Sequence, residues 1–276
     1  DGERFIKEAI QKGASAIITD KKNQLKKYKI PFICVKDVRK SLTEACANFY
    51  KKKPLNIIAV TGTNGKSSVA NFFYQILTLN NIPAASIGTL GINSKKYNKK
   101  TKLTSLDSLS LHKNLEILSN KKINHVILEA SSHGLRQKRL DNLNIKTGIF
   151  TNLSHDHLDY HYNMKSYLKS KMYLFRCLLK KKSKVITDEE NKEFKIIKKI
   201  TKNRKLKLAT IGRNSGDIKI LRNKYEKNKQ IITISYNLKN YILEIPLIGF
   251  FQIKNLFMAV LAAMNCGLNE NQIFKK

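Results

Sequence analysis

The chain has 276 residues, 42% of them hydrophobic, but no apolar run of about eighteen residues, so it predicts one large or two small globular domains without membrane insertion. Its four cysteines are scattered and form no C-x-x-C pair, which argues against a disulfide framework or a zinc site and indicates the reduced thiols of a cytoplasmic protein. The formal net charge of +33 comes from 53 basic residues, of which only 8 are Arg, and aromatic residues are not interleaved with them, so specific nucleic-acid recognition is not expected.

The first fifty residues indicate a small α/β unit. Its predicted elements are a helix, two short apolar strands and a second helix opened by a serine cap, at residues 5–10, 16–19, 31–35 and 41–50. The basic segment 51–54 then ends in proline and interrupts the pattern. We therefore place a domain boundary there, with residues 1–50 as the end of an N-terminal domain and residues 51–276 as a central domain.

Buried strands alternate with helices from residue 55 onward. The predicted strands are residues 55–60, 84–88, 125–129, 147–151 and 185–187. This alternation is typical of an α/β fold, a mostly parallel sheet covered by helices that binds ligands at the carboxyl ends of its strands. Beyond about residue 208 we expect a short antiparallel extension followed by a final helix, at residues 218–221, 230–236, 241–245 and 255–265.

Residues 61–68 read TGTNGKSS, between a buried strand and the start of a helix. Free backbone N–H groups and the positive end of the helix dipole converge on an anion in such a turn. Lys66 is expected to reach the terminal phosphates of a nucleotide, and the Ser67 hydroxyl to bind Mg²⁺. Because Val60 stands where the common GxxxxGK[ST] motif has glycine, the turn is of the narrower TGTxGK[ST] type. We interpret it as an ATP site.

Further polar residues follow two other strands. Glu129 ends the strand 125–129, where a carboxylate can hold Mg²⁺ directly or through water. Residues 152–161 read NLSHDHLDYH and directly follow the strand 147–151. Such a density of His and Asp can bind a metal ion or position a nucleophile. With no cysteine nearby, Mg²⁺ is favoured over zinc.

Several separated motifs together resemble the Mur ligase family. They are TGTNGKSS, EASSHGL at residues 129–135 with Gln137 and Arg139, NLSHDHLDYH, and GFFQIKN at residues 249–255, which is similar to the family's GxFNxxN signature. Residues 1–6 and 13–18 resemble the end of that family's N-terminal uridine-binding domain. The resemblance implies that the chain is a fragment lacking the C-terminal amino-acid-binding domain, and that it binds nucleotide without completing the reaction.

The resemblance also implies an activity, that of an ATP-dependent amide ligase of peptidoglycan biosynthesis. ATP would phosphorylate the free D-Glu carboxylate of UDP-N-acetylmuramoyl-L-Ala-D-Glu, and the amine of meso-diaminopimelate or lysine would attack the acyl phosphate. Which of the two diamino acids is used stays open. A monomer is expected. The alternatives are a folylpolyglutamate synthase-like ligase, a nucleic-acid-binding P-loop ATPase and a non-catalytic remnant.

By the same resemblance, the site residues fall into three groups. The ATP-binding residues would be Gly62, Thr63, Asn64, Gly65, Lys66, Ser67, Ser68 and Asn255. The magnesium ligands would be Ser67, Glu129, His157 and Lys171, the last as a carbamylated lysine. The catalytic residues would be Lys66, Lys171, Glu129 and His157. The muramyl dipeptide would contact Thr104, Ser105, Ser131, Gln137 and Arg139.

The chain departs from the family pattern at three places. Ser105 stands where the second of two paired threonines is usual, which keeps a hydroxyl, and Gln252 replaces the first Asn of GxFNxxN. Residues 187–190 read Thr-Asp-Glu-Glu instead of Asn-Ala-Asp-Asp. We therefore do not expect direct base recognition by residues 187–190.

Overall fold

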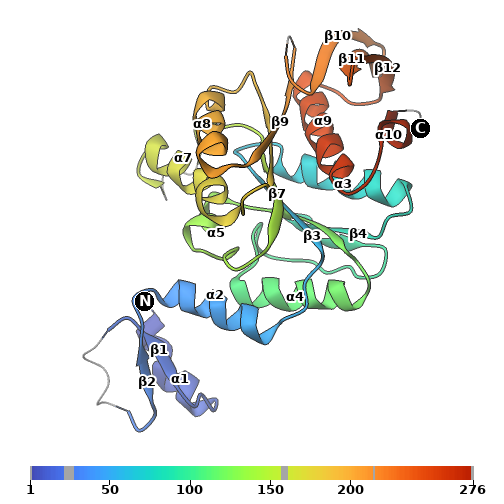
Figure 1. Ribbon diagram of the computed structural model, residues 1–276. Helices are drawn as coiled ribbons and strands as arrows, with labels where there is room; N and C mark the ends of the chain where they lie inside the picture. Colours follow the sequence, from blue (N-terminus) through green and yellow to red (C-terminus); the bar gives the residue numbers. More distant parts are fainter. Residues whose placement is uncertain (1, 22–27, 157–160, 214, 275–276) are drawn as a thin grey trace.

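A ten-stranded sheet with helices on both faces forms the main body of the protein (Figure 1). The computed structural model describes residues 2–21, 28–156, 161–213 and 215–274. The strands of the sheet are β3 (Asn56–Thr61), β4 (Ala84–Gly88), β5 (Gly91–Ser94), β6 (His125–Glu129), β7 (Ile145–Phe150), β8 (Lys184–Asp188), β9 (Lys207–Gly212), β10 (Ile218–Glu226), β11 (Lys229–Tyr236) and β12 (Lys239–Ile245). They are arranged in the order β12-β11-β10-β9-β8-β7-β3-β6-β4-β5.

Most of the sheet is parallel. All neighbouring pairs from β10 through β4 are parallel, whereas β10–β11, β11–β12 and β4–β5 are antiparallel. The predicted α/β class, with a mostly parallel sheet and an antiparallel extension, is therefore confirmed. The sequence does not predict β5, which lacks a run of β-branched residues, and it does not separate the parallel strand β9 from the antiparallel region.

Two layers of helices cover the sheet. One face carries α3 (Lys66–Leu79) and α9 (Phe250–Met264); the other carries α4 (Ser108–Asn120), α5 (Ser132–Arg136), α7 (Met164–Tyr173) with a π-helical turn at Leu174–Leu178, and α8 (Phe194–Arg204). Strand β3 explains both layers, because Ile58 and Val60 belong to the first hydrophobic core and Ile57 and Ala59 to the second. Because helices cover both faces of the sheet, all of these side chains are buried, which explains why the strand is apolar without interruption.

The last predicted helix differs in its bounds. Helix α9 begins at Phe250 rather than at residue 255, because Gly249 supplies the backbone break at φ +86°. Asn255 consequently lies inside the helix. A further short helix, α10 (Glu270–Phe274), follows it.

The N-terminal unit has its own two-stranded parallel sheet, formed by β1 (Ile17–Thr19) and β2 (Phe32–Cys34). It also contains a 3₁₀ turn (Gly2–Phe5), α1 (Ile6–Gln11) and α2 (Val38–Phe49). The predicted serine cap of the second helix is wrong: the Asp37 side chain accepts a hydrogen bond from Lys40 N at 2.9 Å, so α2 begins three residues before Ser41. Since the two sheets are separate, we retain the boundary at residues 51–54 as a proposal.

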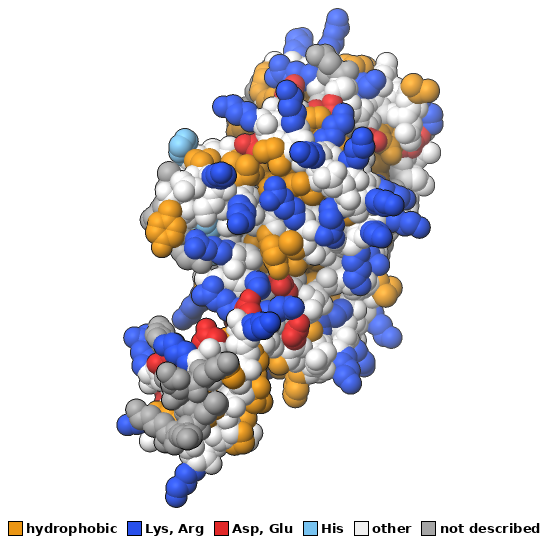
Figure 2. Space-filling model, turned by 60° about the vertical axis from the view of Figure 1, so that its left-hand side comes forward, with side chains coloured by type: hydrophobic (Ala, Val, Ile, Leu, Met, Phe, Trp, Pro, Cys, Tyr) orange, Lys and Arg blue, Asp and Glu red, His pale blue; other side chains and the backbone are white. Residues whose placement is uncertain are grey.

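Helix α2 fastens this unit to the main body. The Thr43 Oγ1 atom on α2 lies 2.7 Å from the Ser108 Oγ atom on α4, and the Asp37 carboxylate forms an ion pair with Lys138. Figure 2 shows Lys and Arg side chains spread over both parts of the molecule on the face that it presents. In the described ranges, no helix has the length and hydropathy needed to span a bilayer.

Candidate active site

The loop between β3 and α3 lies at the carboxyl edge of the sheet, as the sequence predicts. Gly62 has φ +154°, and a Cβ atom there would lie 1.8 Å from the Thr151 Oγ1 atom. Gly65 precedes α3 at φ +85°, and its Cβ would lie 2.5 Å from the Asn255 Oδ1 atom. Both positions therefore require glycine, because β7 and α9 press against the loop from two sides.

Residues that follow β7 hold this loop in place. The Thr151 Oγ1 atom donates to Asn64 O at 2.6 Å. The Asn152 side chain accepts from Asn64 N at 3.0 Å and donates to Asn64 O at 3.2 Å. The sequence analysis included Thr151 in a predicted strand and Asn152 in the run 152–161 but assigned neither of them this role, although ligand-binding residues gather at the ends of strands in a parallel sheet.

Two lysines converge on the same backbone carbonyl. Lys66 Nζ donates to Gly62 O at 3.0 Å and to Thr63 O at 2.6 Å, while Lys171 Nζ donates to Gly62 O at 2.6 Å. Burial lowers the pKa of Lys66. Burial and, next, the nearby Lys66 charge lower the pKa of Lys171 to about 7, and the Lys171 side chain is only 1% exposed. The two amines thus disfavour each other's charged form, and an anion bound beside them would favour it.

A buried carboxylate faces the two lysines across the site. Glu129, 3% exposed, accepts from Ser67 Oγ at 3.0 Å, from Thr89 N at 2.9 Å and from Thr89 Oγ1 at 3.2 Å. Carboxylate and hydroxyl oxygens are the donors that Mg²⁺ prefers, so Ser67 and Glu129 fit such an ion. Thr89 was not predicted, and its signal is that it directly follows the strand 84–88.

The histidine-rich run is only partly described. His157 lies outside the described residues, so its predicted metal role has no structural account. His155 is exposed, whereas His161 is buried with its ring centroid 5.0 Å from that of Tyr167. Among the residues that are described, no group of three or more His, Cys, Asp and Glu side chains is arranged to hold a metal ion.

The serines predicted to contact the acid substrate lie beside Glu129. The Ser105 Oγ atom donates to Glu129 O at 2.7 Å and lies 2.9 Å from Ser131 Oγ. The Thr89 Oγ1 atom lies 3.1 Å from Thr104 Oγ1, which adds Thr104 to this set of hydroxyl groups. The structure therefore brings the predicted hydroxyl groups together at the ends of β4 and β6.

Arg139 extends this group. Its Nη1 atom donates to Ser105 O at 2.7 Å, and its Nε and Nη2 atoms donate to Gln137 Oε1 at 3.0 and 2.6 Å. These contacts fix the plane of the guanidinium beside the serines. A guanidinium held in this way suits the recognition of a carboxylate or phosphate.

Two adjoining cavities open at this edge of the sheet. The first, about 250 Å³, is lined by Thr63, Asn64, Gly65, Lys66, Ser67, Ser68, Thr89, Thr104, Glu129, Ser131, Ser132, Tyr167 and Lys171. The second, about 560 Å³, is lined by Asn64, Gly65, Ser68, Thr151, Asn152, Asp188, Asn191, Phe251, Lys254, Asn255 and Met258. Because the two share Asn64, Gly65 and Ser68, one elongated ligand can occupy both.

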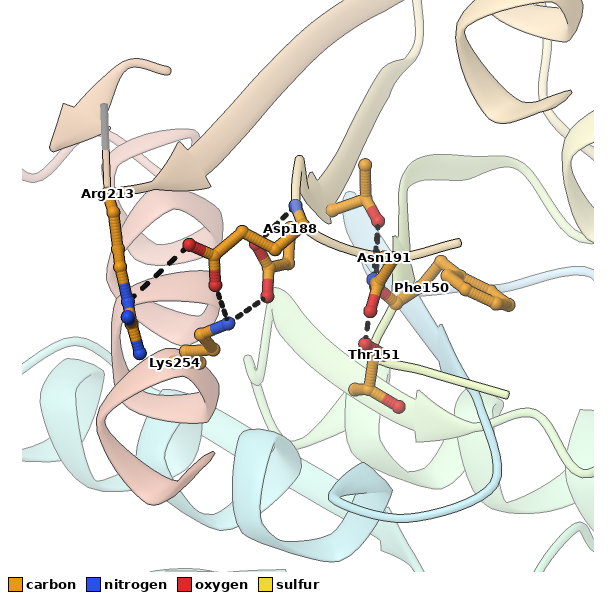
Figure 3. A network of polar contacts seen from close by, with 8 residues as sticks. Phe150, Thr151, Asp188, Asn191, Arg213 and Lys254 are labelled. Atoms are coloured by element: carbon orange, nitrogen blue, oxygen red, sulfur yellow. Dashed lines mark hydrogen bonds and ion pairs between the residues drawn. The ribbon is translucent and has the colours of Figure 1, made fainter. Parts of the chain in front are cut away.

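Figure 3 shows one wall of the larger cavity. Asn191 Nδ2 donates to Thr151 O at 2.9 Å and to Thr187 Oγ1 at 3.3 Å. The Asp188 carboxylate accepts from Lys254 Nζ at 2.7 Å. Asp188 of the segment 187–190 therefore does border the cavity, but its carboxylate, like that of Glu190, is engaged by a lysine that the sequence analysis did not single out.

The fold and the site place the chain in a family. Residues 60–263 match the Mur ligase middle domain, and the chain belongs to the Mur ligase family, which confirms the resemblance found in the sequence.

Individual proteins that are similar to this chain carry more specific names than the family. The chain is 41% identical, over 266 residues, to the UDP-N-acetylmuramoyl-L-alanyl-D-glutamate--2,6-diaminopimelate ligase of Rickettsia montanensis, covering 95% of this chain and 55% of that protein. A solved structure with the same ligase name matches with a TM-score of 0.87 at 27% identity, covering 99% of this chain and 56% of the other. The apo form of L. casei FPGS shares the fold, with a TM-score of 0.67 at 14% identity over 86% of this chain and 65% of its own. This chain thus spans about half the length of the curated relatives it matches.

Proposed function

We propose that this chain carries the ATP site and the acid-substrate site of a ligase that adds a diamino acid to UDP-N-acetylmuramoyl-L-alanyl-D-glutamate in peptidoglycan synthesis. One observation carries the proposal: Lys66, Lys171, Ser67 and Glu129 converge on a single cavity of about 250 Å³. The 41% identity to the Rickettsia ligase supports the substrate. That ligase's name makes 2,6-diaminopimelate the favoured amino acid.

The chemistry requires two anions to meet. A carboxylate is a poor electrophile, so an oxygen of the D-Glu side chain would attack the γ-phosphorus of ATP and ADP would leave. The amine would then attack the acyl carbon, and phosphate would leave. Lys66 would stabilise the negative charge on the transferred phosphoryl group. Ser67 and Glu129 would hold Mg²⁺, which when bound supplies further charge neutralisation.

The surroundings of Lys171 support its carbamylation. With a pKa of about 7, a large share of its side chain is neutral amine at neutral pH. That neutral amine would attack CO₂ and release one proton to give a carbamate anion. Counted from the ammonium form, two protons leave and a buried positive charge is replaced by a negative one. The exchange would relieve the repulsion from Lys66 and supply an oxygen ligand for a second Mg²⁺.

The larger cavity is proposed to take the base and ribose. Its volume of about 560 Å³ and its mixed lining of Phe251, Met258 and polar side chains suit a nucleoside. Asn255 touches Gly65 at the junction of the two cavities, where it would contact the nucleotide. The hydroxyls of Thr104, Ser105 and Ser131 with Gln137 and Arg139 would hold the muramyl dipeptide on the other side of the phosphates.

The folate-directed alternative has weaker support. FPGS shares only the fold with this chain, at 14% identity, whereas the relative at 41% identity is named for the muramyl substrate. A nucleic-acid-stimulated ATPase is suggested by charge alone.

The test is to trap the acyl phosphate. The chain is incubated with Mg·ATP, hydroxylamine and either UDP-N-acetylmuramoyl-L-Ala-D-Glu or folate, and hydroxamate and ADP are measured together with the affinity for each acid. We expect the muramyl dipeptide alone to bind and to yield hydroxamate, and Lys66→Met to yield none. Binding of folate but not of the muramyl dipeptide would contradict the proposal.

A further inference from the structure

Four charged side chains from three segments form one network beside the larger cavity (Figure 3). Lys254 Nζ, on α9, donates to Asp188 Oδ2 at 2.7 Å and also pairs with the Glu190 carboxylate, just after β8. Arg213, just after β9, has its Nε atom 3.5 Å from Glu190 Oε1. The Phe250 ring lies under both cations, 4.8 Å from Arg213 Cζ and 5.3 Å from Lys254 Nζ.

The charges of this network cancel, because two cations face two carboxylates. Lys254 is the central member, since it contacts both acids and its side chain is only 19% exposed. Burial alone would lower its pKa, but the hydrogen bonds that Lys254 donates to Asp188 and Glu190 more than offset this, and the pKa is raised. Lys254 therefore stays charged over the whole physiological range.

The network borders the larger cavity, so its net charge affects the binding of an anion there. Asp188 and Lys254 line the same cavity as Asn64, Gly65 and Ser68 of the phosphate-binding loop. The Asp188 side chain is 5% exposed, so the field of its carboxylate is poorly screened by solvent. If Lys254 were neutral, only Arg213 would face the two carboxylates, so the network would carry one net negative charge that repels any polyphosphate entering the cavity.

We propose that Lys254 is a positioning residue for nucleotide binding, which cancels the negative charge of Asp188 and Glu190 so that the loop can accept a polyanion. The proposal rests on the ATP site proposed above and adds a residue to it. It also accounts for the acidic segment 187–190, which would otherwise oppose a nucleotide in this cavity.

Equilibrium titration of the chain with Mg·ATP tests the proposal, using wild type, Lys254→Met and Lys254→Arg. We expect about tenfold weaker binding for Lys254→Met, as for the loss of one compensating charge at short range, and wild-type-like binding for Lys254→Arg. Lys239→Met is the matched control, because Lys239 also forms an ion pair, with Glu270, but on β12 outside the cavity. Its affinity should equal that of wild type.

A second substitution separates a charge effect from a structural one. Adding Glu190→Gln to Lys254→Met should restore most of the lost affinity, because it returns the network, with Arg213 and Asp188 remaining, to zero net charge. If Lys254 only braces the fold, the double variant should bind no better than the single one. Glu190→Gln alone retains Lys254 and should bind Mg·ATP about threefold more tightly at low salt.

The outcomes are distinguishable. Equal binding by wild type and Lys254→Met, no recovery in the double variant, or unchanged or weaker binding by Glu190→Gln would overturn this inference while leaving the ATP site intact. Failure of the wild type to bind Mg·ATP would overturn the proposed function and this inference with it. Should Lys254→Met not fold, the Glu190→Gln titration decides.

Discussion

Lys171 should make the stability of the folded chain depend on pH in a direction opposite to that of an ion-paired lysine. Its pKa is about 7 in the folded state and 10.5 as the model value for an exposed lysine. Between these pH values the unfolded chain binds one more proton than the folded chain, so the free energy of unfolding rises with pH. The contribution of Lys171 is therefore least favourable below pH 7 and reaches its full value above pH 10.5.

The magnitude follows from the same two pKa values. At 1.36 kcal/mol per pH unit, the interval corresponds to about 5 kcal/mol, which is the cost of keeping a buried ammonium in a site that is 1% exposed and beside Lys66. Lys171→Met removes that charge. The variant should be more stable than wild type at pH 6, and its advantage should shrink by about 1.4 kcal/mol for each pH unit above 7.

The assay is urea unfolding at pH 6, 7, 8 and 9 in buffers freed of CO₂. Wild type and Lys171→Met are compared with Lys169→Met, in which an exposed lysine on the same helix is removed. The control should follow wild type at every pH. Parallel curves for wild type and Lys171→Met would refute the reasoning, because they would mean that Lys171 keeps an ordinary pKa. Added bicarbonate at pH 8 should then stabilise wild type but not Lys171→Met, and ¹³C NMR with labelled bicarbonate should show a carbamate signal only when Lys171 is present.

Three further substitutions test other parts of the site. Gly62→Ala should cost about 1–3 kcal/mol more stability than Gly13→Ala in urea unfolding, because both backbones have positive φ but only Gly62 would drive its Cβ into Thr151; equal costs would contradict the packing described. Glu129→Gln should weaken the dependence of ATP binding on Mg²⁺ by about tenfold in titrations with and without the ion, and an unchanged dependence would remove Glu129 from the metal site. Arg139→Lys should lower the affinity for the muramyl dipeptide by about tenfold with little change for ATP, since it loses the bidentate fork; equal losses for both ligands would indicate a general structural defect.

Much of the fold could be predicted because its main signals are local. The apolar strands 55–60 and 125–129 and the glycine turn between strand and helix fix both the sheet and the edge where ligands bind. The ends of the helices were less predictable. Helix α2 starts at an aspartate cap, and α9 starts behind Gly249, because several nearby residues could serve as caps or breaks and the packing decides among them.

The site residues also divide into those with a local sequence signal and those that depend on packing. The loop 61–68 and Glu129 follow from strand-end positions, whereas the burial of Lys171 and the engagement of Lys254 depend on contacts between residues far apart in the chain. Lys254, for example, pairs with Asp188 across 66 positions of sequence. In a chain with 53 basic residues, no single lysine carries a signal of its own. The packing of the folded chain determines which lysines are buried, so the sequence alone does not identify them.

Equilibrium titration of the chain with Mg·ATP, for wild type and for Lys66→Met, tests most directly whether the cavity at the ends of β3 and β6 is a triphosphate site. Among the described residues, Lys66 donates only to backbone carbonyls of the loop, so its removal should leave the fold intact while withdrawing the charge that faces the phosphates. We predict saturable, Mg²⁺-dependent binding by wild type that weakens at least about tenfold in the variant. Equal affinities in the two proteins, or no binding by wild type, would contradict the account.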